Sequence, residues 1–185
     1  MPDRSVFLDR DGTLILDRGY TYRVEDFQLL DGTAEGLRLL QALGFRLVIV
    51  TNQSGIARGR YTEADMQRFN EYLLDQLRLE GIGLAGLYYC PYHPDGVGGY
   101  RCDSELRKPA PGMLLQAARE LDLDLAGSFA IGDKKSDVLA GKAAGCRTFL
   151  VQTGMAGQGE PELVVEPDWV VADLRAAARV IQGLR

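Results

Sequence analysis

Residues 6–14 read Val-Phe-Leu-Asp-Arg-Asp-Gly-Thr-Leu, and this stretch decides the fold. Three apolar residues run directly into Asp9, Asp11 follows two positions later, and Gly12 opens a polar turn. An apolar run that ends in a polar, glycine-containing turn is typical of a buried parallel strand. In open α/β sheets, ligands bind beyond the carboxyl ends of the strands. The stretch therefore predicts a site at the end of the first strand.

The two carboxylates of this stretch indicate the chemistry of that site. One could attack as a nucleophile while the other moves a proton. Carboxylates this close repel each other, so we expect a cation between them. Taken alone, the stretch is also compatible with an Asx turn that carries two solvated aspartates.

The composition limits the classes of protein to consider. The chain has 185 residues, of which 46% are hydrophobic and 25% charged, and we expect a single domain over residues 1–185. Its net charge of -5 argues against nucleic-acid and anionic-membrane partners, which require a basic face. No apolar run is long enough to span a membrane, and no signal peptide precedes the first strand. Three cysteines fit a reducing compartment, so we expect a cytoplasmic protein. We also expect it to act as a monomer.

Apolar strands alternate with amphipathic helices along the rest of the chain. Further strands are expected over residues 46–50, 87–89, 129–131, 147–151 and 169–171. A capping box at Thr62 opens the longest helix. This alternation predicts a doubly wound parallel sheet of the α/β class. The segment 154–167, rich in Gly, Glu and Pro, is expected to be a surface loop.

Polar side chains follow two more of the predicted strands. Thr51 offers a hydroxyl, and residues 52–55 offer backbone N–H groups to phosphate oxygens. Arg107 and Lys108 place two cations before a proline-capped helix, where Lys suits a phosphoryl oxygen and Arg a second anion. An ordinary strand-to-helix turn and a solvated basic pair are the alternatives.

A fourth polar cluster follows the strand expected at 129–131. Asp133 is placed to complete an oxygen-ligand site for Mg²⁺, and Asp137 could orient that site or bind through water. The alternative is helix N-capping by Asp133 or Ser136. Four strand ends with complementary chemistry favour one shared site over four unrelated turns.

Together, these stretches resemble the motifs of the haloacid dehalogenase-like phosphatases: DxDGT, then Thr, Lys and GDxxxD. The strings at 50–59, 89–91, 107–109 and 111–113 resemble the branch that acts on histidinol phosphate and heptose 1,7-bisphosphate. The resemblance runs from about Val6 to Gly154 and implies a Rossmann-like fold without a large cap domain. It implies an Mg²⁺-dependent phosphomonoester hydrolase with an aspartyl-phosphate intermediate. The implied reaction removes the 7-phosphate of the heptose bisphosphate for lipopolysaccharide synthesis, with histidinol phosphate or another small sugar phosphate as the alternative substrate.

The resemblance also implies a role for each matching residue. Asp9 would be the nucleophile and Asp11 the acid and base, while Thr51 and Lys108 would hold the transferring phosphoryl group. The side chains of Asp9 and Asp133 and the backbone carbonyl of Asp11 would bind Mg²⁺. The residues implied to contact substrate are Asp17, Arg18, Gly19, Tyr20, Asn52, Gln53, Ser54, Arg107 and Lys134.

The segment 90–106 departs from the family pattern. Many relatives bind zinc here, but Tyr92 stands where a ligand histidine is expected and His93 comes one position late. Cys102 is not followed by a second Cys-type ligand. Structural zinc needs four N or S ligands, so we expect no zinc and a loop that covers one side of the site through turns and packing. Zinc bound by Cys90, His93, Cys102 and an acidic residue is the alternative.

A second class of function is also compatible with an aspartate after a first strand. A receiver-like signalling module is phosphorylated on such a residue. Asp11 argues against this reading, because a signalling module gains nothing from an acid–base group that speeds dephosphorylation.

Overall fold

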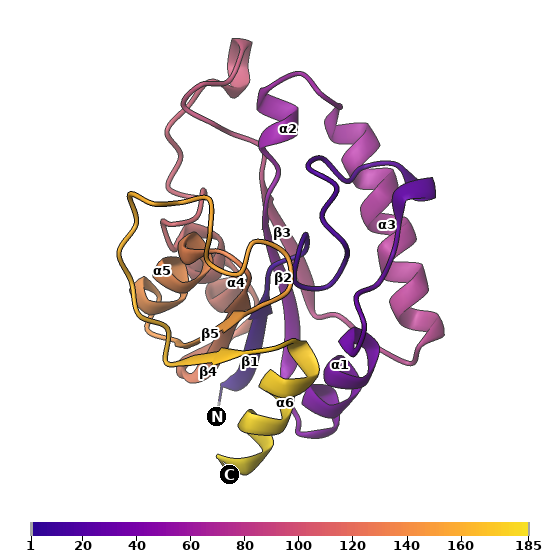
Figure 1. Ribbon diagram of the computed structural model, residues 1–185, viewed down its shortest axis with the longest axis vertical. Coiled ribbons are helices and arrows are strands. Elements are labelled where there is room, and N and C mark those ends of the chain that lie inside the picture. Colours follow the sequence, from indigo (N-terminus) through magenta and orange to yellow (C-terminus); the bar gives the residue numbers. More distant parts are fainter. Residues whose placement is uncertain (1, 185) are drawn as a thin grey trace.

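The computed structural model describes residues 2–184 and contains a six-stranded sheet in which every neighbouring pair of strands is parallel (Figure 1). The strands lie in the order β3-β2-β1-β4-β5-β6. Their bounds are β1 (Asp3–Leu8), β2 (Arg46–Asn52), β3 (Gly86–Cys90), β4 (Leu123–Gly132), β5 (Arg147–Val151) and β6 (Trp169–Val171). The doubly wound parallel sheet predicted from the sequence is therefore confirmed.

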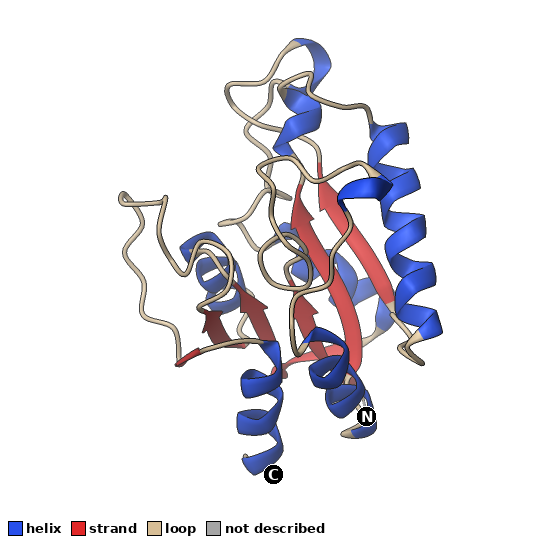
Figure 2. Ribbon diagram, turned by 45° about the vertical axis from the view of Figure 1, so that its right-hand side comes forward, coloured by secondary structure: helices blue, strands red, loops and turns tan. Residues whose placement is uncertain are grey.

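Helices cover both faces of this sheet (Figures 1 and 2). Their bounds are α1 (Thr33–Ala42), α2 (Ser54–Ala57), α3 (Glu63–Leu79), α4 (Gly112–Leu121), α5 (Lys135–Ala143) and α6 (Leu174–Gly183), with short 3₁₀ turns at Val24–Asp26 and Gly98–Tyr100. Successive side chains of a strand point to opposite faces. On β1, Val6 and Leu8 enter the core formed with α1, α3 and α6, and Phe7 enters the core formed with α4 and α5.

The longest helix begins where the sequence predicts. The Thr62 side chain accepts a hydrogen bond from the Asp65 N–H, and the Asp65 carboxylate accepts one from the Thr62 N–H. Phe69, Leu73 and Leu77 then follow at helical spacing and are fully buried against the sheet. These side chains pack into the same core as residues of β1 and β2, and the first turn of α3 contacts the end of β3 through the hydrogen bond from Tyr89 to Glu63.

Strand β4 is longer than expected, because it begins at Leu123 rather than at Phe129. Asp3 and Arg4 pair with Leu123 and Asp124, and the register shifts before Val6 pairs with Phe129. The Ser5 N–H donates to the Ser128 hydroxyl, 2.8 Å away. A side chain thus satisfies a backbone group at the irregularity, which apolar periodicity alone does not reveal.

The chain order places a topological switch point beside Asp9. The chain builds β1, β2 and β3 outward in one direction and then returns to β4 on the other edge of β1. Asp9 follows β1 and Asp133 follows β4, and the Asp9 N–H donates to the Ile131 carbonyl at 3.0 Å. Ligands of open α/β sheets bind at such points. Among residues 2–184, no helix is long and apolar enough to cross a membrane.

Candidate functional site

Three buried carboxylates meet at the switch point, and we call them the acidic centre: Asp9, Asp133 and Asp137. One oxygen of each lies within 4.8 Å of an oxygen of the others. Asp9 comes from the end of β1, Asp133 from the end of β4, and Asp137 from the first turn of α5. The sequence predicted that Asp9 and Asp133 converge, and the fold brings Asp137 into the same cluster.

The Lys108 ammonium is the cation that the structure places in the acidic centre. Its Nζ lies 2.7 Å from Asp9 Oδ1, 2.6 Å from Asp137 Oδ1 and 2.8 Å from the Val50 carbonyl. These three acceptors use all three N–H donors of the ammonium. Burial would lower the pKa of Lys108, but Asp137 and Asp9 raise it above its ordinary value, so the side chain stays charged.

The Asn52 amide holds Lys108 in place from β2. Its Nδ2 donates to the Lys108 carbonyl at 2.9 Å, and its Oδ1 accepts from the Lys108 N–H at 3.1 Å. Both polar atoms of this side chain therefore form hydrogen bonds with the Lys108 backbone, although the sequence predicted that Asn52 contacts substrate.

Two oxygen atoms of the acidic centre are buried without a hydrogen-bond partner among residues 2–184: Asp9 Oδ2 and Asp133 Oδ1. An unpaired buried carboxylate oxygen is costly, so such atoms indicate a ligand. Burial, together with the charges of Asp9 and Asp137, raises the pKa of Asp133 to about 8. Burial also acts to raise the pKa of Asp9, but Lys108 and Lys134 keep it below its ordinary value. Carboxylate oxygens are the ligands that Mg²⁺ prefers, so this donor set fits that ion.

Glycine backbones close tightly over Asp133. Gly12 has a φ of +85°, and a Cβ at this position would collide with the Asp133 carboxylate. The Met155 N–H donates to Asp133 Oδ2 at 2.6 Å, and the Gly157 N–H donates to the Asp133 carbonyl at 2.7 Å. The first part of the segment 154–167, expected to be an ordinary surface loop, thus packs against the acidic centre. Asp133 uses its carboxylate there and does not cap α5.

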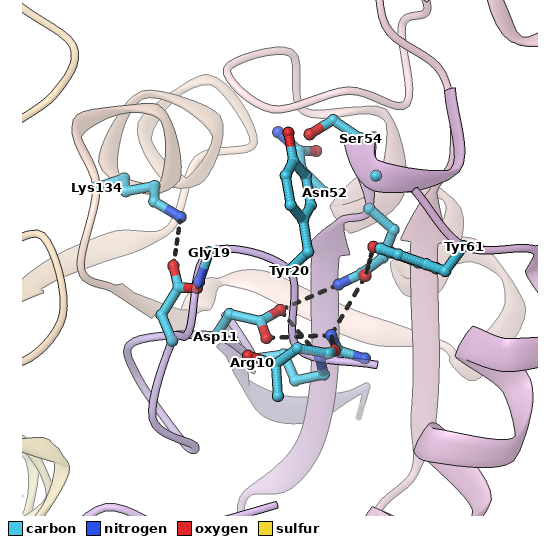
Figure 3. A pocket seen from close by; sticks show the side chains of 12 residues that line it. Arg10, Asp11, Gly19, Tyr20, Asn52, Ser54, Tyr61 and Lys134 are labelled. Atoms are coloured by element: carbon cyan, nitrogen blue, oxygen red, sulfur yellow. Dashed lines mark hydrogen bonds and ion pairs between the residues drawn. The ribbon is translucent and has the colours of Figure 1, made fainter. Parts of the chain in front are cut away.

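Asp11 lies beside the acidic centre but faces a different set of partners (Figure 3). Its carboxylate accepts from the Arg10 guanidinium at 3.0 and 3.1 Å and from Gln53 Nε2 at 3.1 Å. Burial raises the pKa of Asp11, although Arg10 acts in the opposite direction. A carboxyl with a raised pKa suits a group that donates a proton.

Two neighbouring cavities adjoin this region. The smaller, about 90 Å³, contains Asp11, Asp17, Gly19, Tyr20, Asn52, Gln53, Ser54 and Lys134 in its lining. The larger, about 240 Å³, contains Asn52, Ser54, Arg107, Lys134 and Glu160. Asn52, Ser54 and Lys134 line both cavities, so the two lie side by side, with Asp11 on the smaller and Arg107 on the larger.

Of the residues predicted to contact substrate, all but Arg18 line one of these two cavities. The Arg18 guanidinium points to Gln28 Oε1, 3.4 Å away at the exposed surface, and does not line either cavity. Gln53 lines the smaller cavity but is only 2% exposed, and its amide donates to Asp11 and Thr51 rather than toward the cavity. Lys134 Nζ lies 3.8 Å from Asp17 Oδ2, and the two side chains close one side of the smaller cavity (Figure 3).

Sequence reasoning missed three residues in this region: Arg10, Tyr61 and Glu160. Arg10 is 1% exposed and is a buried side chain at the centre of a polar network. Its position between two aspartates was the available signal. The Glu160 carboxylate accepts from the Ser136 N–H at 2.8 Å and enters the larger cavity from a segment without regular structure, which periodicity could not place.

The segment 90–106 is held by a carboxylate and two phenols, which we call the Glu63 clamp. The Tyr89 and Tyr100 hydroxyls donate to the two oxygens of Glu63, each at 2.6 Å. Cys90 is buried and Cys102 exposed, and within residues 2–184 neither they nor His93 belong to a group of three converging ligand atoms. The expectation that the loop lacks zinc stays a prediction.

Comparisons with known proteins agree with this geometry. A family model described as HAD-hydrolase-like matches residues 105–177. D-glycero-β-D-manno-heptose-1,7-bisphosphate 7-phosphatase of Pasteurella multocida (strain Pm70) is 46% identical over 187 residues, covering 98% of each chain. The protein of the same name from Escherichia coli (strain K12) is 43% identical over 180 residues, covering 96% of this chain and 93% of the relative.

Solved structures are similar along nearly the whole chain. D,D-heptose 1,7-bisphosphate phosphatase from B. bronchiseptica, complexed with magnesium and phosphate, has a TM-score of 0.85 and 31% identity and covers 98% of this chain and 99% of its own. A HAD-like phosphatase structure from Mesorhizobium loti has a TM-score of 0.83 and 35% identity, covering 98% of this chain and 88% of its own. The chain therefore belongs to the haloacid dehalogenase-like family of phosphatases.

Proposed function

We propose that this phosphatase removes the 7-phosphate of D-glycero-D-manno-heptose 1,7-bisphosphate with Mg²⁺ bound in the acidic centre. The observation that carries the chemistry is the pair of unpaired buried oxygens, Asp9 Oδ2 and Asp133 Oδ1, inside a cluster of three carboxylates. The observation that supports the substrate is the name shared by the relatives at 41% to 46% identity.

Mg²⁺ would be held by the side chains of Asp9 and Asp133 and by the backbone carbonyl of Asp11. Asp137 instead pairs with Lys108 at 2.6 Å, so its role is to hold that ammonium. When bound, Mg²⁺ would neutralise charge on the phosphoryl oxygens and so allow an anionic nucleophile to approach.

The reaction follows from the positions of Asp9 and Asp11. An Asp9 oxygen attacks phosphorus, the bond from phosphorus to the sugar oxygen breaks, and Asp11 gives its proton to that oxygen. Water then attacks the aspartyl-phosphate, Asp11 takes up the proton, and inorganic phosphate leaves with Asp9 restored. Thr51 would hold the transferring phosphoryl group in both steps, and Lys108, whose three donors already have acceptors, would exchange one of them for a phosphoryl oxygen.

The two cavities support a substrate with two phosphates. The smaller cavity, beside Asp11, has room for a phosphoryl group and the first hydroxyls of a sugar. The larger contains Arg107, whose guanidinium suits a second phosphate at the far end of the sugar. A monophosphate would leave this cation without its partner.

A substrate comparison tests the proposal. Phosphate release would be measured with heptose 1,7-bisphosphate, heptose 7-phosphate and histidinol phosphate, each with Mg²⁺ present and after chelation. We expect the highest kcat/KM for the bisphosphate and no turnover without a divalent ion. Arg107→Gln should narrow the preference for the bisphosphate over the monophosphate by at least tenfold, a loss of about 1.4 kcal/mol of transition-state binding. Higher kcat/KM for histidinol phosphate would reject the proposed substrate.

A further inference from the structure

The Gln53 side chain is buried beside the carboxylates and has four partners. Its Oε1 accepts from the Tyr61 hydroxyl at 2.5 Å and from Arg10 Nη2 at 3.2 Å. Its Nε2 donates to Asp11 Oδ2 at 3.1 Å and to the Thr51 hydroxyl at 2.8 Å. An amide offers two donors and two acceptor sites, so all are used. A flipped amide would set its N–H groups against the Arg10 donor and its oxygen against the Asp11 carboxylate, and this fixes its orientation.

The Arg10 guanidinium stabilises the same network through hydrogen bonds. Its Nε and Nη2 donate to the two oxygens of Asp11, and its Nη1 donates to Asn70 Oδ1 at 2.8 Å. Nη2 also donates to the Thr21 carbonyl at 2.7 Å, and the guanidinium lies 4.8 Å from the centre of the Phe69 ring. Through Asn70 the network therefore joins Asp11 to α3, which is anchored in the core. Figure 3 shows the part of the network that contains Arg10, Asp11 and Tyr61.

The hydrogen bonds of the network leave one acceptor position of the Asp11 carboxylate unused. A carboxylate has about four acceptor positions, two on each oxygen. Oδ2 accepts from Arg10 and Gln53, which uses both of its positions, whereas Oδ1 accepts once, from Arg10. The side chain is 14% exposed, so the remaining position on Oδ1 can be reached from outside the network.

We propose that Gln53, oriented by Tyr61 and Arg10, is a positioning residue that aligns Asp11 with Thr51 and so makes Oδ1 the oxygen that transfers the proton. This assignment replaces the expected role of Gln53 as a substrate contact. It rests on the proposed phosphatase mechanism, since Thr51 would hold the phosphoryl group whose leaving oxygen Asp11 protonates. Gln53 spans the two side chains and holds their hydrogen-bonding atoms in one arrangement.

If Gln53 positions Asp11, losing it affects substrates differently according to whether their leaving group needs a proton, which the loss of a purely structural residue would not do. A sugar alkoxide is a poor leaving group and needs its proton in the transition state, whereas p-nitrophenolate leaves without one. Dephosphorylation of Asp9, in which Asp11 takes up a proton, is common to both substrates and enters kcat, whereas kcat/KM reports only the steps up to departure of the alcohol. Misplacing Asp11 therefore lowers kcat/KM for a sugar phosphate and spares kcat/KM for p-nitrophenyl phosphate. A variant that merely loosens the fold or disturbs Thr51 lowers both.

Two variants test this, with one matched control. Gln53→Glu keeps the shape but removes both donors of Nε2, and Tyr61→Phe removes only the hydroxyl that fixes the amide. The control is Tyr22→Phe, because the Tyr22 ring stacks on Tyr61 at 4.7 Å while its hydroxyl meets the exposed Arg23. Steady-state kcat and KM would be measured on the heptose bisphosphate and on p-nitrophenyl phosphate, with thermal melting to verify folding.

We expect Gln53→Glu to lower kcat/KM for the sugar phosphate by about 100-fold and Tyr61→Phe by about tenfold. In both variants the fall in kcat/KM for p-nitrophenyl phosphate should be at least tenfold smaller than the fall for the sugar phosphate. Tyr22→Phe should stay within about twofold of the parent on both substrates. Equal losses of kcat/KM on the two substrates, or no loss on either, would overturn the assignment. If Gln53→Glu does not fold, Tyr61→Phe decides alone. A parent protein that releases phosphate from neither compound would reject the proposed function instead.

Discussion

Two regions of this molecule carry residues of the types that bind metals, and they differ in how those residues are placed. In the acidic centre, Asp9, Asp133 and Asp137 converge within 4.8 Å and leave two buried oxygens without a partner in the part of the chain that the structure describes. In the segment 90–106, the Cys90 thiol lies 3.9 Å from the Tyr92 carbonyl, and Cys102 is exposed.

Protein groups hold the segment 90–106 in place. The Glu63 clamp binds two tyrosines, the Val97 N–H donates to the Ala57 carbonyl at 2.8 Å, and the His93 imidazole lies 3.1 Å from Arg58 and accepts from the Asp95 N–H. The comparison teaches that residue type alone does not indicate a metal site. Convergence of ligand atoms, together with unsatisfied polar groups, is what indicates a missing ligand.

The largest effect should come from the acidic centre itself. Asp9→Asn removes the attacking oxygen, and we expect kcat for phosphate release to fall by at least about 10⁴-fold while the fold survives. Asp3→Asn is the matched control, because it makes the same substitution at an exposed position at the start of β1. Activity of Asp9→Asn within tenfold of the parent would remove Asp9 from the nucleophilic role.

The second-largest effect should be the stabilisation of the folded protein by Mg²⁺, measured as a rise in Tm without substrate. An ion present at 100 times its Kd stabilises the folded state by about 2.7 kcal/mol. For a chain of this length, that corresponds to a rise in Tm of about 5–10 °C on adding Mg²⁺. Asp133→Asn should abolish the rise, because Asp133 supplies one of the two unpaired oxygens. A full Mg²⁺ response in that variant would place the ion elsewhere.

A smaller effect is expected when the Glu63 clamp is broken. Glu63→Gln replaces two charge-assisted hydrogen bonds with neutral ones at a partly exposed site, so Tm should fall by only about 3 °C. Glu71→Gln, at an exposed position on the same helix, should leave Tm unchanged.

The clamp also predicts a pH dependence. Hydrogen bonds from Tyr100 and Tyr89 lower the pKa of Glu63 below its ordinary value of 4.5. A carboxyl with a lowered pKa contributes its stability above the ordinary value and loses it as the pH falls through the folded-state pKa. The Tm difference between the parent and Glu63→Gln should therefore be constant near neutral pH and shrink below pH 4.5. A difference that grows in acid would contradict the clamp.

The smallest effect is expected at Cys102. Its thiol is exposed and lies 3.5 Å from the Asp103 carbonyl, so Cys102→Ser should change stability by no more than about 0.5 kcal/mol and leave turnover unchanged. A zinc assay on the purified protein sharpens the comparison. Bound zinc that Cys102→Ser releases, with a fall in Tm, would show that the segment 90–106 is a metal site after all.

Several features of the site could be predicted because they follow strand ends. Asp9, Thr51 and Asp133 come at or directly after the apolar part of three strands, and the carboxyl ends of parallel strands share one edge of a sheet. Their convergence therefore required only the correct assignment of strands. Asp137 was harder, since its pairing with Lys108 depends on how α5 packs against a loop that precedes α4.

The sequence by itself determined the alternation of strands and helices, the positions of the acidic and basic residues at the strand ends, and the family to which the chain belongs. Only the tertiary structure decided that Gln53 faces Asp11 and Thr51, that Glu63 joins Tyr89 to Tyr100, and that residues 154–157 close over Asp133. The physical reason is that the period of apolar residues reports which face of an element is buried. The hydrogen-bond partners of a buried polar side chain depend instead on groups that are far apart in the chain and meet only after the core has packed.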